Sequence, residues 1–401
     1  GLGDVYKRQG VTTVTWRVYD AQGNVNSCTF DVTITDNENP TLTCVADQSR
    51  NTDATECNYT AAAGEFDLTG AADNCGVVDT TYQLSGATII AETSSRSLDG
   101  IDFNTGVTTV TWRVYDAQGN VNSCTFDVTV TDNENPTLTC VADQSRNTDA
   151  TECNYTAAAG EFDLTGAADN CGVVDTTYQL SGATIIAEAS SRSLDGVDFN
   201  TGVTTVTWRV YDAQGNVNSC TFDVTVTDNE NPTLTCVADQ SRNTDATECN
   251  YTAAAGEFDL TGAADNCGVV DTTYQLSGAT IIAETSSRSL DGIDFNTGVT
   301  TVTWRVYDAE GNVNSCTFDV TVTDNENPTL TCVADQSRNT DATECNYTAA
   351  AGEFDLTGAA DNCGVVDTTY QLSGATIIAE TSSRSLDGVD FNTGVTTVTW
   401  R

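Results

Sequence analysis

Sixteen cysteines are the residues of this chain whose chemistry the spacing constrains most strongly. Four of them, Cys44, Cys57, Cys75 and Cys124, recur at intervals of 96 residues. An even number per interval, without any histidine or CxxC pair, is typical of disulfides rather than of zinc or redox sites. We therefore predict an oxidising, extracellular or cell-surface location. The spacing alone leaves three pairings of four cysteines open.

Carboxylates are the second chemically capable group. The chain carries 58 Asp and Glu residues against 15 Lys and Arg, a formal net charge of −43. Such a charge repels nucleic acid and anionic membranes, so neither is expected as a partner. Carboxylates attract hard cations, above all calcium. The alternative is a solvated acidic surface that only keeps the protein soluble.

Enzymatic activity is not expected. Without histidine, the usual general base for a serine or cysteine nucleophile is missing. A pair of catalytic carboxylates would have to recur in every copy, which does not suit a single catalytic cleft. No stretch approaches the roughly 18 apolar residues of a membrane span.

A block of 96 residues, repeated almost unchanged, organises the chain, and each block is large enough for one domain. Complete copies are expected at 36–131, 132–227 and 228–323. The C-terminal part of a truncated copy covers 10–35, and a copy truncated at its C-terminus covers 324–401. Residues 1–9 resemble a translated transposon end of the kind used in sequencing libraries, and are interpreted as a sequencing or cloning scar.

Short alternating segments within one copy predict strands. Cys124, Phe126, Val128 and Val130 share one face, and the preceding run places Trp112 on the inward face. A turn at 116–120, with glycine for positive φ, joins the two runs into a hairpin. Further strands are expected after Pro40, where Leu42 and Cys44 alternate, and at 58–62, 77–84 and 87–92. About seven short strands without a helix predict an all-β, antiparallel sandwich for each copy, repeated in tandem.

These motifs resemble a known family. The run Pro40–Cys44, the loop Asp73–Gly76, the strand Gly106–Trp112 and the segment Tyr115–Phe126 are similar to the hyalin repeat, or HYR domain. The closest likeness is to tandem copies in very large surface proteins of marine Bacteroidota. The resemblance implies immunoglobulin-like sandwiches and a role in extracellular adhesion, and it implies no enzymatic activity.

The resemblance also implies a disulfide pairing. Animal members tend to keep the cysteines that match Cys44 and Cys124 and to lack the two that match Cys57 and Cys75. Because paired cysteines disappear together, two pairs within each copy are expected. The expected pairs are Cys44–Cys124, Cys57–Cys75, Cys140–Cys220, Cys153–Cys171, Cys236–Cys316, Cys249–Cys267 and Cys345–Cys363, with Cys28 and Cys332 unpaired.

The joints between copies form a candidate cation site. Each joint reads Asp-Asn-Glu-Asn-Pro and contains one of the four prolines, so it is expected to be short and stiff and the array an extended rod. The motif resembles the joint between cadherin domains, which binds calcium. The candidate ligands for calcium are Asp36, Glu38, Asp73, Asp116, Asp132, Glu134, Asp169, Asp212, Asp228, Glu230, Asp265 and Asp308. The alternative is that Asp169 and Asp212 only cap their own loops.

Two functions fit these expectations. In the first, the array is a spacer that projects other domains of the same long chain from a bacterial cell surface. In the second, each copy binds a glycan or a surface protein weakly, and copy number supplies avidity. Accessory modules of a large secreted enzyme are a further alternative.

Overall fold

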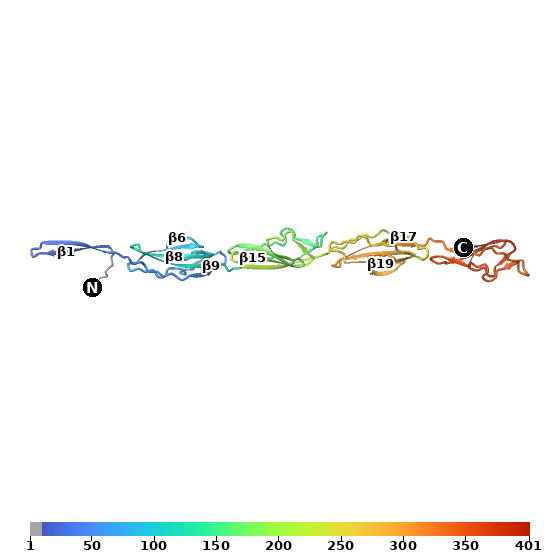
Figure 1. The fold of residues 1–401 in the computed structure, drawn as a ribbon, viewed down its shortest axis with the longest axis horizontal. Coiled ribbons are helices and arrows are strands. Elements are labelled where there is room, and N and C mark those ends of the chain that lie inside the picture. Colours follow the sequence, from blue (N-terminus) through green and yellow to red (C-terminus); the bar gives the residue numbers. More distant parts are fainter. Residues whose placement is uncertain (1–9) are drawn as a thin grey trace. The chain divides into compact units, whose positions relative to one another are not determined.

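The computed structural model describes residues 10–401 as β-strands joined by turns, and no helix occurs in that range (Figure 1). The predicted scar at 1–9 lies outside the described residues. None of the described segments is a helix long and apolar enough to cross a membrane. The all-β prediction is confirmed.

The first complete repeat contains seven strands, about the number expected, although the sequence analysis placed no strand at 48–51 or 102–104. They are β3 (Gln48–Asn51), β4 (Asn58–Thr60), β5 (Val77–Gly86), β6 (Ile90–Ser94), β7 (Asp102–Asn104), β8 (Gly106–Asp116) and β9 (Val121–Thr131). Five of them form a sheet in the order β3-β9-β8-β5-β6, and β4 pairs with β7 in a second, smaller sheet. Strands β8 and β9, which Figure 1 labels, are neighbours in this sheet, and β5 lies between β8 and β6.

The next two repeats have the same strands. In the second they are β10 (Gln144–Asn147), β11 (Asn154–Thr156), β12 (Val173–Gly182), β13 (Ile186–Ser190), β14 (Asp198–Asn200), β15 (Gly202–Asp212) and β16 (Val217–Thr227). In the third they are β17 (Gln240–Asn243), β18 (Asn250–Thr252), β19 (Asp271–Gly278), β20 (Ile282–Ser286), β21 (Asp294–Asn296), β22 (Gly298–Tyr307) and β23 (Val313–Thr323). The five-stranded sheets follow the orders β10-β16-β15-β12-β13 and β17-β23-β22-β19-β20.

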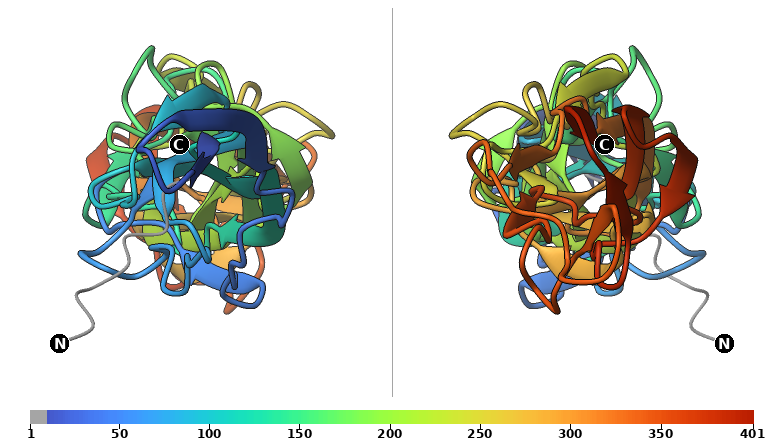
Figure 2. Two further views of the ribbon diagram at one scale, coloured as in Figure 1. Left: turned by 90° about the vertical axis from the view of Figure 1, so that its left-hand side faces the viewer. Right: turned by 90° about the vertical axis from the view of Figure 1, so that its right-hand side faces the viewer.

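The two end segments contain parts of this pattern. The last segment contains β24 (Thr329–Thr331), β25 (Asn346–Thr348), β26 (Gly358–Ala360), β27 (Thr369–Gly374), β28 (Ile378–Ser382), β29 (Asp390–Asn392) and β30 (Thr396–Trp400). At the other end, β1 (Gly10–Tyr19) and β2 (Val25–Ile34) form a hairpin, drawn in dark blue in the left view of Figure 2. Trp16 of this hairpin is 64% exposed, whereas the equivalent Trp112 is fully buried.

The core forms where the alternation predicted it. In the hairpin of β8 and β9, Trp112 pairs with Cys124, and Val110, Trp112 and Phe126 are buried. Trp112 is therefore a core residue. Phe66 connects the two sheets, because its ring lies 5.4 Å from that of Phe103 on β7 and 6.2 Å from that of Phe126 on β9. Burial of these side chains provides the main driving force for folding each repeat.

Two details differ from the sequence prediction. Strand β3 pairs with β9 in parallel, with Gln48 opposite Val128, so the larger sheet is not purely antiparallel. The strand predicted after Pro40 is reduced to an isolated bridge between Thr41 and Ala72. Leu42 and Cys44 pack against the core, and their alternation thus reflects burial without a strand ladder.

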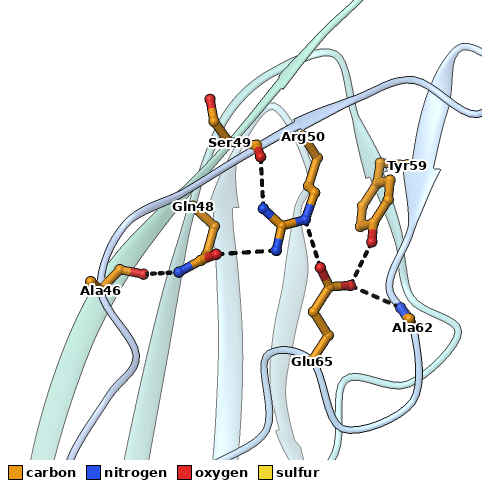
Figure 3. A network of polar contacts seen from close by, with 7 residues as sticks. All are labelled: Ala46, Gln48, Ser49, Arg50, Tyr59, Ala62 and Glu65. Atoms are coloured by element: carbon orange, nitrogen blue, oxygen red, sulfur yellow. Dashed lines mark hydrogen bonds and ion pairs between the residues drawn. The ribbon is translucent and has the colours of Figure 1, made fainter.

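A polar network covers the outer edge of this core (Figure 3). The Arg50 Nε donates to Glu65 at 2.6 Å, and Tyr59 donates to the other carboxylate oxygen at 2.6 Å. The guanidinium of Arg50 also lies over the ring of Phe66, at 5.6 Å. Burial favours the protonated form of Glu65, but bonds from Tyr59, the Ala62 amide and Arg50 outweigh it. The pKa of Glu65 consequently lies below its usual value.

Three of the predicted disulfides form inside repeats: Cys44–Cys124, Cys140–Cys220 and Cys236–Cys316. The other predicted pairs, Cys57–Cys75, Cys153–Cys171, Cys249–Cys267 and Cys345–Cys363, are wrong. The structure instead joins consecutive repeats through Cys57–Cys171, Cys153–Cys267 and Cys249–Cys363. Cys28 and Cys332 are exposed and form no disulfide, as predicted. Cys345 is also exposed and forms no disulfide, contrary to the prediction.

Cys57 and Cys75 do not pair because they lie at opposite ends of the sandwich. The Thr52 amide bonds Thr131 at the end of β9, so Cys57 lies at the end of the repeat where the next linker begins. Cys75 follows Asp73, which lies beside Asp36 at the other end. The 11 residues of β9 span about 35 Å between these ends. A disulfide requires Cα atoms within about 7 Å, and the Cα atoms of Cys57 and Cys171 are 4.5 Å apart.

Two compact units divide the chain. One contains residues up to Arg146 together with Thr156–Val226, and the other contains Asn147–Tyr155 and Thr227–Arg401. The short segment Asn147–Tyr155 belongs to the second unit because Cys153 is bonded to Cys267 there.

Candidate cation site at the joints between repeats

The turn at the end of β15 fixes the first carboxylate of the candidate site. Asp212 accepts hydrogen bonds from the amides of Gln214 and Asn216 at 2.9 and 2.7 Å, and from the Asn216 side chain at 2.6 Å. Gly215 adopts φ of +90°, a conformation that glycine adopts without strain. Asp212 is only 3% exposed. The turn therefore holds a buried carboxylate at one end of the sandwich.

Asparagine side chains attach the linker to this turn. The Asn216 side chain donates to the carbonyl of Asp132 at 3.1 Å, and Asn218 donates to the carbonyl of Pro136 at 2.9 Å. These bonds place Asp132, the first residue of the linker motif, beside the turn. Equivalent bonds from Asn120 to Asp36 and from Asn312 to Asp228 repeat the arrangement at the other two joints.

The loop Asp169-Asn170-Cys171 supplies the third carboxylate and contacts the preceding repeat. Asp169 accepts a bond from the Cys171 amide at 2.8 Å. Asn170 donates to the Thr52 hydroxyl at 3.1 Å, and Thr52 in turn donates to Asp132 at 3.3 Å. Cys171 itself is bonded to Cys57. Three successive residues thus carry a carboxylate, a bridging amide and a covalent cross-link.

Carboxylates meet at each of three joints. In each group, one oxygen from each of three residues lies within 4.8 Å of the others. The groups are Asp36, Asp73 and Asp116; Asp132, Asp169 and Asp212; and Asp228, Asp308 and Glu310. We refer to them as the first, second and third acidic groups.

The sequence analysis thus predicted part of this grouping, whereas calcium binding at it stays a prediction. It named every member of the first two groups and two members of the third. Glu38, Glu134 and Glu230 are not members of any group, and Asp265 is replaced by Glu310 in the third. Asp265 instead caps the Cys267 amide at 2.8 Å. The capping bonds named as the alternative also form, at both Asp169 and Asp212, so the same side chains cap loops and face one another.

Hydrogen bonds from neighbouring residues stabilise the ionised form of Asp212 in the second group. Burial favours the protonated form of Asp212, but the bonds from Asn216, Gly215 and Gln214 outweigh it. The pKa of Asp212 therefore lies below its usual value, and the side chain is ionised at neutral pH. Asp132 is 5% exposed, and the two donors to its Oδ1, the Thr52 hydroxyl and the Glu134 amide, are neutral.

The sequence analysis missed the polar side chains whose hydrogen bonds connect the linker with the neighbouring loops. Thr52, Asn170 and Asn216 were not singled out, although each lies in every copy of the repeat. A signal was present for Cys171, because it follows Asp169 by two residues. Once Asp169 is placed at the linker, Cys171 must lie there too, facing the preceding repeat.

The oxygen chemistry of the groups would suit a hard cation. The ligand atoms are all oxygens, and histidine nitrogen is absent from the chain. Oxygen-only sets of carboxylates and amides suit calcium or magnesium, whereas zinc prefers nitrogen and sulfur.

Comparisons with known proteins identify the repeat. A model of the HYR domain matches residues 35–130, 131–226 and 227–322. Hyalin of Strongylocentrotus purpuratus is 28% identical over 404 residues, covering 98% of this chain and 29% of that protein. Hyalin of Lytechinus variegatus is 25% identical over 342 residues, covering 84% of this chain and 57% of that protein. The chain thus spans less than two thirds of either relative.

Solved structures with similar chains were also found. A structure titled as a Ca2+-stabilized adhesin that helps an Antarctic bacterium reach out and bind ice is 17% identical, with a TM-score of 0.33. The match covers 78% of this chain and 82% of that one. The human desmocollin-1 ectodomain is 12% identical, with a TM-score of 0.25, over 95% of this chain and 83% of that one.

Proposed function

Because this chain belongs to the HYR domain family, we propose that it is a non-catalytic, extracellular repeat array that forms the stalk of a bacterial cell-surface adhesin. The repeats at 36–131, 132–227 and 228–323 are its units. Six disulfides support an oxidising, extracellular location. The other domains of the long chain supply the anchor and the ligand-binding tip.

The position of the disulfides inside the repeats carries this proposal. Cys44 and Cys124 are 80 residues apart in a repeat of 96, so the bond bypasses most of the backbone. Tension along the chain passes from Cys124 through the linker to Cys140, about 16 residues, and then across to Cys220. A repeat whose strands separate under load can lengthen only over this short segment. A stalk built this way keeps its length when pulled.

Force spectroscopy on the full chain tests the proposal. Under oxidising conditions, stretching should give no extension step near 280 Å, the length that about 80 released residues would add. After reduction of the disulfides, steps of this size should appear, one for each complete repeat. Steps near 280 Å in the oxidised chain would contradict the stalk. The variant Asp223→Asn, a mid-strand change, serves as a control that should leave both traces unchanged.

A repeated exposed side chain favours a second candidate function, multivalent binding. Ile89, Ile185, Ile281 and Ile377 occupy one position in successive repeats and are each 80–81% exposed. An apolar side chain at this position gives every repeat the same small contact, which copy number would strengthen. Tyr82 is buried and therefore offers no aromatic platform for a glycan. Saturable binding of the full chain to a glycan array, abolished by Ile185→Ser and Ile281→Ser together, would favour binding over the stalk.

A further inference from the structure

We propose that each of the three acidic groups binds one calcium ion, and that the disulfide between repeats, Cys57–Cys171, preorganises the second site. The proposal concerns the joints and holds whether or not the array acts as a stalk. It rests on three observations: unpartnered buried oxygens, the ligand chemistry, and the covalent attachment of the loops beside the acidic groups.

Two buried carboxylates have an oxygen that a cation could bind. Asp132 in the second group and Asp228 in the third are each 5% exposed, and the Oδ2 of each has no hydrogen-bond partner. A buried charged oxygen without a partner is strongly unfavourable, and buried polar atoms are nearly always satisfied. In both groups, one oxygen of each of two further carboxylates lies within 4.8 Å of an oxygen of this residue. A cation at this point would satisfy the unpartnered oxygen and offset the repulsion among the three.

Amide oxygens at the same joints add neutral ligands. The Oδ1 atoms of Asn170 and Asn266 are buried and also lack a partner. Asn266 lies beside the third group, because its Nδ2 is 3.5 Å from Asp228. Three carboxylates, an amide oxygen and water can form the shell of six to eight oxygens that calcium takes.

The composition of the groups favours calcium over magnesium. The second group uses Asp169, whereas the third uses the longer Glu310 from a different loop. Calcium tolerates variable ligands at 2.3–2.6 Å, whereas magnesium requires a near-ideal octahedron at about 2.0–2.1 Å. A site whose third ligand differs between copies fits the flexible cation.

The disulfide restricts the loop that carries the ligand. Asp169 is two residues from Cys171, which is bonded to Cys57 of the preceding repeat, and Asn170 between them donates to Thr52 and to the Glu56 carbonyl. A loop fixed in the binding conformation loses less entropy when the ion binds. The bond between Cys57 and Cys171 should therefore raise calcium affinity at the second group.

Isothermal titration of calcium chloride into the metal-free full chain tests the sites. We expect about three ions per chain, with dissociation constants of roughly 10⁻⁴–10⁻³ M, the range of extracellular modules. Asp132→Asn should reduce the number to two, because it removes a ligand charge while keeping the side-chain size. Asp169→Asn, tested separately with circular dichroism to check folding, should cause the same loss.

A matched control removes a charge away from the joints. Asp223 lies on β16 between the turn and the linker and accepts a bond from Thr205, which asparagine can also accept. Asp223→Asn should keep three ions. No saturable heat up to about 10 mM calcium, or three ions in both Asp132→Asn and Asp169→Asn, would overturn the proposal.

The coupling to the disulfide has a separate readout. The double variant Cys57→Ser and Cys171→Ser should weaken one of the three ions about 3- to 10-fold and leave the other two unchanged. Three ions with unchanged affinity would show that the disulfide does not preorganise the site.

Discussion

The two kinds of disulfide occupy different regions of the molecule. Cys44 and Cys124 pack against the apolar core of one sandwich. Cys57 and Cys171 lie among polar side chains at a joint, next to Asn170 and Asp169. The first kind secures a fold that its own hydrophobic contacts already define. The second links one repeat covalently to the next.

Removing a core disulfide should have the largest effect on stability. Cys140→Ala with Cys220→Ala opens a loop whose ends are 80 residues apart. Loss of a native disulfide of this kind costs about 2–5 kcal/mol. We expect calorimetry of the full chain to show one new transition at lower temperature, from the second repeat. An unchanged melting profile would show that the core does not depend on the bond.

Removing a disulfide at a joint should affect geometry more than folding. In Cys57→Ala with Cys171→Ala, each sandwich keeps its core, so circular dichroism should not change. The distribution of distances between spin labels at Ser123 and Ser219 should widen, because the loop at Cys171 is held only by hydrogen bonds. The same two labels in the variant Cys140→Ala with Cys220→Ala provide the comparison. Their distance distribution should not widen at temperatures below the new unfolding transition of that variant. A narrow distribution in both variants would make the joint independent of its cross-link.

The same contrast explains what the sequence could predict. The core followed from local alternation, since Val110, Trp112 and Phe126 are placed by their own strands and by the hairpin register. The disulfide at the joint depends on residues 114 positions apart. Once Cys44 and Cys124 are paired, a repeat considered alone offers only Cys75 as a partner for Cys57. Pairing within one copy was the shorter loop, but the length of β9 separates the two cysteines.

The acidic groups were more predictable from the sequence than the disulfide at the joint and less predictable than the core. Asp132, Asp169 and Asp212 were predicted because they flank elements that meet at one end of a sandwich. Glu310 was not, because the other copies have glutamine at that position, as at Gln118 and Gln214. One substituted residue therefore changes the third group, and no periodic argument can anticipate it.

An intermediate effect is expected from the network of Arg50, Tyr59 and Glu65. Because the pKa of Glu65 is lowered in the folded state, its contribution is fully present above the ordinary pKa near 4.5. The contribution is lost as pH falls through the lower, folded-state value. Glu65→Gln should cost about 1–2 kcal/mol at neutral pH. The difference from the unmutated chain in urea denaturation should shrink below about pH 4.

Glu92 provides the control for this network. It pairs with Arg113 at 2.9 Å, but its side chain is 38% exposed, compared with 16% for Glu65. Exposed ion pairs contribute little, so Glu92→Gln should change the free energy of unfolding by less than about 1 kcal/mol. Equal losses in the two variants would mean that burial of Glu65 against the core does not strengthen its bonds.

The smallest effect on folding, and the sharpest comparison between joints, is expected from Glu310→Gln. Glu310 is exposed, so the substitution should change the free energy of unfolding by no more than about 0.5 kcal/mol. It gives the third turn the glutamine that the first two carry and removes a carboxylate from the third acidic group. Calcium titration should then show one of the three ions weakened about tenfold, since a charged ligand is lost. If the affinities stay the same, Asp265 rather than Glu310 completes the third site, and the three joints bind calcium in one way.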